Sequence, residues 1–157
     1  KLEGVTAIGL SSEATCAVVA PDGQLVCWGR DGVGLMANGE ADQNHAIPQA
    51  LAGMTGGTAL AGGGSHMCLL GGGSVACWGS GGAGQLGDGT SWGAQGTPTA
   101  VPMVTDVQKI RAGASATCAV SASETKCWGN NDKDQMGQGL YYSEEALQVL
   151  GLDVDVP

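Results

Sequence analysis

The chain has 157 residues, with six Lys and Arg against fifteen Asp and Glu, and a net charge of −9. So few cations argue against nucleic-acid and anionic-membrane partners, because both are bound through clustered cations that displace counterions. No apolar run approaches the ~20 residues of a membrane-spanning helix. We therefore expect a soluble chain that does not insert into membranes, and the 29 glycines indicate that it is rich in turns.

The triplet Cys-Trp-Gly recurs at positions 27, 77 and 127. Each copy follows another cysteine and precedes a glycine-rich run, which is fullest at Gly84-Gln85-Leu86-Gly87-Asp88-Gly89. Self-similarity at this period is typical of propellers, solenoids and other repeat arrays. We therefore divide the chain into repeats at 1–52, 53–102 and 103–157, the last with the start of a further repeat.

Each repeat contains four segments with strand-like composition and no helical periodicity. The first strands are expected at 5–10, 58–61 and 107–112, the second at 15–19, 66–70 and 117–120, and the third at 25–28, 75–78 and 125–128. The fourth, outer strands are expected at the segments 48–51, 98–104 and 146–150, the first two of which are marked by proline. This pattern predicts an all-β fold of three four-stranded antiparallel propeller blades, which gain most of their stability by stacking on one another.

The turns between the second and third strands predict how the cysteines pair. In the third repeat, a two-residue turn at Ala122-Ser123 places Cys118 opposite Cys127. Opposed residues in an antiparallel pair have Cβ atoms ~4.5–5.5 Å apart, close enough for a disulfide. The same counting in the other hairpins predicts Cys16–Cys27 and Cys68–Cys77. Such disulfides indicate an oxidising, extracellular compartment, whereas six buried free thiols in a cytosolic protein or a zinc site are the alternatives.

The combined pattern resembles the regulator of chromosome condensation repeat family. The second repeat carries it best, with Gly63-Gly64-Ser65-His66, then Cys77-Trp78-Gly79, then the run from Gly84 to Thr90, and finally Pro98. The resemblance implies a propeller that usually closes with seven blades. Three blades cannot close a ring, so further repeats, association of chains, or an open arc are possible; the open arc is the least favoured because it exposes apolar faces.

Few of the family's activities can be expected of this chain from the resemblance. Guanine-nucleotide exchange requires a protruding wedge, and no insertion of that kind interrupts these repeats. The paired cysteines are more similar to secreted or surface members of the family. We therefore expect a structural or adhesive extracellular protein-interaction module, with a binding regulator of another protein as the alternative, either a secreted inhibitor or an exchange-factor-like propeller.

No catalytic constellation or cofactor site is predicted. His66 occupies a place filled by alanine in the sister repeats, which favours a structural role linking a strand to a loop, and His45 is expected in a polar loop. The segment from Asn130 to Asp134 offers oxygens at alternate positions, but Gln135 and Tyr141 stand where a calcium loop needs Gly and Glu. We predict no enzyme activity, no metal and no cofactor.

Three aromatic residues fall outside the repeat pattern: Trp92, Tyr141 and Tyr142. All three follow a glycine-rich run, in loops where binding residues tend to lie on rigid scaffolds. Tyr and Trp anchor protein interfaces out of proportion to their number. We predict that they mark a protein-contact surface, with cover for a neighbouring blade as the equally favoured alternative.

Overall fold

The computed structural model describes residues 1–39, 43–139 and 141–149. Within this part of the chain, twelve β-strands form three four-stranded antiparallel sheets, named here blades 1, 2 and 3. Blade 1 contains β1 (Val5–Leu10), β2 (Ala14–Val19), β3 (Gln24–Arg30) and β4 (Asn44–Ala50). Blade 2 contains β5 (Gly57–Gly62), β6 (His66–Gly71), β7 (Ser74–Ser80) and β8 (Ala94–Ala100). Blade 3 contains β9 (Val107–Ala112), β10 (Ala116–Ser121), β11 (Thr125–Asn130) and β12 (Tyr142–Gln148).

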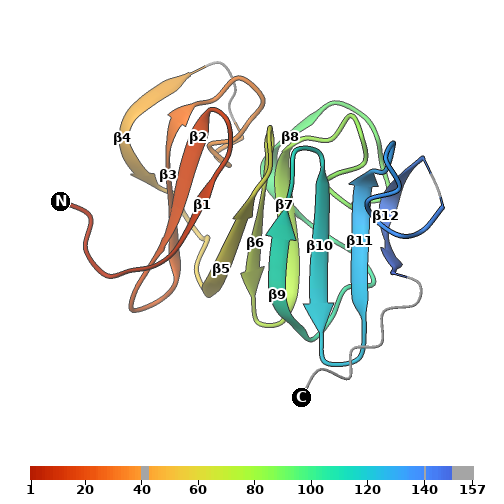
Figure 1. Cartoon of the computed structure of the whole chain (residues 1–157). Coiled ribbons are helices and arrows are strands. Elements are labelled where there is room, and N and C mark those ends of the chain that lie inside the picture. Colours follow the sequence, from red (N-terminus) through yellow and green to blue (C-terminus); the bar gives the residue numbers. More distant parts are fainter. Residues whose placement is uncertain (40–42, 140, 150–157) are drawn as a thin grey trace.

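The three blades stand side by side in chain order (Figure 1). The first strands are neighbours, with β1 against β5 and β5 against β9, while β4, β8 and β12 form one outer edge of each sheet. Among the described residues no helix is long and apolar enough to cross a membrane. The predicted fold class is confirmed: the chain folds as part of a β-propeller, in an open arc.

The predicted outer strands were placed too late in the sequence. They begin four residues earlier than the segments 48–51, 98–104 and 146–150, because pairing starts directly after the Trp-Gly dipeptide. The first pairs of these ladders are Arg30 with Asn44, Ser80 with Ala94, and Asn130 with Tyr142. Prolines 48 and 98 lie inside the outer strands rather than at their starts, which an edge strand tolerates. His45 consequently lies in β4 and not in a loop.

The Cys-Trp-Gly triplet has a specific backbone shape. Pairing of the third with the fourth strand shifts register across the tryptophan in all three blades. The glycine that follows has a positive φ, 99° at Gly79, and a Cβ added there would lie 2.6 Å from the Ser65 carbonyl oxygen. The triplet therefore combines a disulfide residue, a tryptophan at a strand irregularity and a glycine that no larger residue can replace without a clash.

The hydrophobic core lies between blades rather than inside them. One cluster joins Cys16, Leu25 and Leu35 of blade 1 to Met67 and Trp78 of blade 2. The second cluster repeats this arrangement between blades 2 and 3, with Cys68, Val75 and Leu86 against Ile110 and Trp128. Stability therefore comes mainly from the contacts between neighbouring repeats, as in other repeat proteins.

Candidate functional site

The structure forms the three disulfides that the turn lengths predict. They join Cys16 to Cys27, Cys68 to Cys77 and Cys118 to Cys127, each with its Cα atoms 4.1 Å apart, and no cysteine is free. Each bond joins directly paired residues of a blade's second and third strands. Closing loops of this length contributes roughly 2–3 kcal/mol each in the chain-entropy model. Their role is to fix the hairpins of the scaffold.

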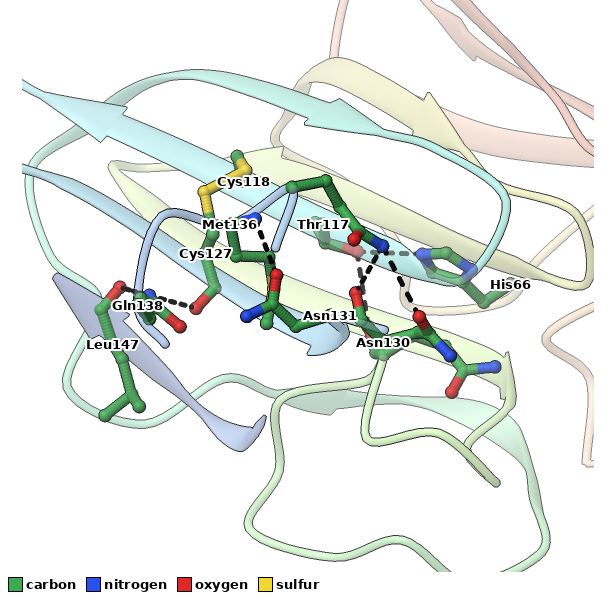
Figure 2. Close-up of a disulfide and its surroundings, with 11 residues drawn as sticks. His66, Thr117, Cys118, Cys127, Asn130, Asn131, Met136, Gln138 and Leu147 are labelled. Atoms are coloured by element: carbon green, nitrogen blue, oxygen red, sulfur yellow. Dashed lines mark hydrogen bonds between the residues drawn. A yellow bond between two sulfur atoms is a disulfide. The ribbon is translucent and has the colours of Figure 1, made fainter. Parts of the chain in front are cut away.

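His66 belongs to a buried hydrogen-bond network between blades 2 and 3 (Figure 2). Its Nε2 lies 2.8 Å from the Thr117 hydroxyl, which donates to the Gln85 carbonyl at 3.2 Å; the Trp128 indole N–H donates to the same carbonyl at 2.9 Å. Because the hydroxyl proton is used by Gln85, His66 must donate from Nε2 and is the Nε2–H tautomer. Its Nδ1 is buried without a partner among the described residues.

Burial lowers the pKa of His66 to about 4, so the imidazole is neutral at physiological pH. The side chain is fully buried, and its one N–H is used in the contact between blades. This geometry supports the structural role predicted for His66. The sequence placed that role between a strand and a loop, whereas the hydrogen bond runs to β10 of the next blade.

The segment considered for calcium uses its side-chain oxygens to hold its own turn. Asn130 Oδ1 accepts from the backbone N–H of Asp132 at 3.0 Å, and Asn131 Oδ1 accepts from the backbone N–H of Met136 at 2.8 Å. Gln138 donates to the carbonyls of Cys127 and Leu147, which ties the loop to β11 and β12 (Figure 2). Within residues 1–39, 43–139 and 141–149, no group of three acidic, His or Cys side chains could hold a metal ion.

Two of the three predicted contact residues line an open hollow at the boundary of blades 2 and 3. Tyr141 and Tyr142 line this hollow together with Asn130 of β11 and with Gly82, Ala83 and Ser91 from the loops of blade 2. Trp92 directly follows Ser91. The three aromatic side chains, called here the aromatic rim, are exposed at 80% for Trp92, 73% for Tyr141 and 47% for Tyr142.

The hollow thus brings Tyr141 and Tyr142 of the third repeat together with loop residues of blade 2. Trp92 and Tyr141 are both largely exposed in the described part of the chain. The small residues of the hollow, Gly82, Ala83 and Ser91, were not found from the sequence. Nothing in their composition distinguishes them from the other turn residues of a glycine-rich chain.

A family model for the regulator of chromosome condensation (RCC1) repeat matches residues 72–120. This segment is an RCC1 repeat. The match begins before β7 of blade 2 and ends in β10 of blade 3, so the matched segment covers parts of two consecutive blades. No curated protein sequence matched the chain.

Solved structures share the fold of nearly the whole chain. Prp20p from Saccharomyces cerevisiae, described with its binding to Gsp1p and histones, is 20% identical with a TM-score of 0.79; the match covers 93% of this chain and 38% of Prp20p. Human WBSCR16 is 17% identical with a TM-score of 0.81, covering 94% of this chain and 38% of that protein. The chain spans well under half of these structures, and at such identities the likeness concerns the fold alone.

Proposed function

We propose that this RCC1-repeat chain is a non-catalytic, extracellular protein-interaction module with a structural or adhesive role, and that the aromatic rim is its contact surface. The observation that carries the proposal is the exposure of Tyr141 and Tyr142 in one hollow at a blade boundary, and of Trp92 directly after the hollow residue Ser91. Exposed large aromatic side chains on rigid elements are the residues that most often anchor protein interfaces.

The buried titratable groups support a scaffold rather than an enzyme. His66 is neutral and bonded between blades. Asp31 is fully buried, its Oδ1 accepts from the Met36 backbone N–H at 3.1 Å, and burial raises the pKa of this carboxyl. Both polar side chains organise the fold and neither faces the hollow of the aromatic rim.

The extracellular location is supported by the disulfides. All six cysteines are paired, each pair inside one hairpin, and structural disulfides persist in oxidising compartments. Small glycine-rich blades gain stability from such local cross-links.

One experiment tests the contact surface and the compartment together. The chain is used to capture partners in parallel from a cell-surface extract and from cytosol, and a captured protein is purified and titrated with wild type and variants. Separately, the intact mass of the chain itself is measured after alkylation without reduction. We expect a surface partner, no alkylated cysteine, and a roughly tenfold or greater loss of affinity for Trp92→Ala and for the double variant Tyr141→Ala/Tyr142→Ala.

Met103→Ala is the matched control, because Met103 is also 75% exposed but lies in the turn after β8, outside the hollow. Equal losses for Met103→Ala and the rim variants would refute the contact surface. Alkylation of all six cysteines would refute the extracellular location.

A further inference from the structure

Consecutive blades meet through two different faces. In each contact, the disulfide-bearing side of one blade, called here its cysteine face, packs on the side of the next blade that carries the tryptophan, called here its tryptophan face. The cysteine face of blade 1 includes Cys16, Val18 and Leu25, and the tryptophan face of blade 2 includes Leu60, Met67 and Trp78. Blades 2 and 3 repeat this order, so every contact has the same direction.

The same hydrogen bonds accompany both contacts. The indole N–H of Trp78 donates to the Leu35 carbonyl of blade 1 at 2.9 Å, as Trp128 does to Gln85. The backbone N–H of Ser12 donates to Gly64 at 3.0 Å, and that of Gly64 donates to Ala114 at 2.8 Å. The contact between blades is therefore a repeated unit with defined donors and acceptors, and each end of the arc presents one half of it.

The half presented by blade 3 carries charges where the other blades carry small residues. In each blade, one residue of the first strand lies opposite the first cysteine of the disulfide. These residues are Gly9 opposite Cys16, Ala61 opposite Cys68 and Arg111 opposite Cys118. Two strand positions earlier, the equivalent residues are Ala7, Ala59 and Lys109. Arg111 and Lys109 are both exposed. Arg111 donates to the Ile110 carbonyl at 2.7 Å, but neither cation has an ion-pair partner among the described residues. A blade docked there would bury two uncompensated positive charges.

Asp134 obstructs the same face. The equivalent residues of the other blades are Gly34 and Gly84, where an added Cβ would lie 2.5 Å from the Gly96 Cα and 2.6 Å from the Ser143 carbonyl oxygen of the next blade. Asp134 has that Cβ and a carboxylate, and it is exposed. Its loop cannot accept a following blade in the way that the first two loops do.

The half presented by blade 1 is apolar and incomplete. Ile8 is 54% exposed, whereas its equivalents Leu60 and Ile110 are 9% and 1% exposed. Leu10 beside it is 61% exposed. Trp28 is only half-buried, and its indole N–H has no acceptor among the described residues, in contrast to the fully buried indoles of blades 2 and 3.

We propose that the arc has a direction: the tryptophan face of blade 1 binds a preceding propeller blade with an uncharged cysteine face, and the cysteine face of blade 3 is a polar end. The partner presents small residues at the places of Ala7 and Gly9, and a backbone carbonyl at the place of Leu35 that accepts from Trp28. A second copy of this chain does not fit, because its free cysteine face carries Lys109, Arg111 and Asp134. The contact between blades 1 and 2 is the template for this interface.

The first test adds a copy of residues 1–52 ahead of Lys1 in the full chain. The junction keeps the natural spacing, because four residues precede β1 from Lys1 and four precede β5 from Gly53. The added cysteine face should cover Ile8, Leu10 and Trp28 of the original blade 1, and the urea midpoint should rise by roughly 1 M or more. The matched control is the same fusion with Ala7→Lys and Gly9→Arg in the added copy, which copies blade 3 and should lose the gain. Equal midpoints for the two fusions would overturn the proposal.

The second test removes the polar end without enlarging the protein. The triple variant Lys109→Ala/Arg111→Gly/Asp134→Gly gives blade 3 an uncharged cysteine face, which fits the exposed tryptophan face of another copy. Its solution mass should show head-to-tail assemblies at concentrations where wild type is monomeric, and Ile8→Asp should dissolve them. The proposal fails if the triple variant stays monomeric. It also fails if wild type itself forms an assembly that Ile8→Asp dissolves.

Discussion

The two contacts between blades use the same frame with different side chains. Between blades 1 and 2, Ala14 and Met67 belong to one apolar cluster. Between blades 2 and 3, the equivalent residues are His66 and Thr117, which form a hydrogen bond of 2.8 Å. The tryptophan-to-carbonyl bond is common to both contacts. The repeat therefore fixes the position of each contact between blades. The residue pair beside the tryptophan differs: it is apolar in the first contact and a buried hydrogen-bonded pair in the second.

The largest expected effect comes from removing the element that both contacts share. Trp78→Ala and Trp128→Ala should each lower the free energy of unfolding by about 3–5 kcal/mol, because both indoles are fully buried. Trp78→Ala should cost more by about 1 kcal/mol. It removes the indole donor from the Leu35 carbonyl, whereas the Gln85 carbonyl keeps Thr117 as a donor after Trp128→Ala. Urea unfolding with the disulfides intact measures both.

The half-buried Trp28 is the internal control for this comparison. Its replacement by alanine should cost under about 2 kcal/mol, since much of its surface already faces water. If Trp28→Ala were as damaging as Trp78→Ala, the tryptophan would stabilise its own blade and not the contact between blades.

The second-largest expected effect is a pH dependence of stability that arises from His66, which lies only in the contact between blades 2 and 3. The unfolded chain binds a proton at His66 below about pH 6.5, whereas the folded protein does so only below about pH 4. The unfolded state therefore binds more protons between these values, and stability present above pH 6.5 is lost as the pH falls towards 4. Wild type should lose on the order of 3 kcal/mol more than His66→Ala across this range.

Urea unfolding at pH 7.5, 5.5 and 4.5 measures this loss in both proteins. Burial raises the pKa of Asp31, which acts in the opposite direction, but that carboxyl is present in both proteins and its contribution cancels in the difference. Parallel pH profiles for wild type and His66→Ala would contradict the neutral, bonded imidazole.

Much of the scaffold could be predicted from the sequence, because the repeat period and the number of residues in each turn determine which strand residues lie opposite one another. Turn lengths place Cys118 opposite Cys127, and the register of the structure agrees. The contact between His66 and Thr117 could not be read in this way, because the two residues lie in different blades and no local pattern connects them. The hollow beside Tyr141 and Tyr142 could be predicted only in part. Aromatic residues outside the repeat pattern are a recognisable signal, but the small residues that line the hollow give none.

The smallest expected effect is the exchange of one contact for the other. The double variant His66→Ala/Thr117→Met copies the Ala14–Met67 pair into the contact between blades 2 and 3. Thr117→Met alone should cost about 2–3 kcal/mol, because it leaves the buried His66 N–H without an acceptor. His66→Ala alone leaves space that the larger Met can fill. The double variant should therefore lie within about 1 kcal/mol of wild type, with a coupling energy of about 1–3 kcal/mol between the two sites.

A double-mutant cycle measured by urea unfolding at pH 7.5, above the range in which His66 titrates, gives this coupling directly. The reverse exchange, Ala14→His/Met67→Thr, is the matched control in the other contact. There the carbonyl equivalent to Gln85 is that of Leu35, which already accepts from Trp78, so a hydroxyl at position 67 can donate to it while accepting from a histidine at position 14. Additive losses in both cycles would show that the polar and apolar pairs are not interchangeable, and that the two contacts differ in more than these side chains.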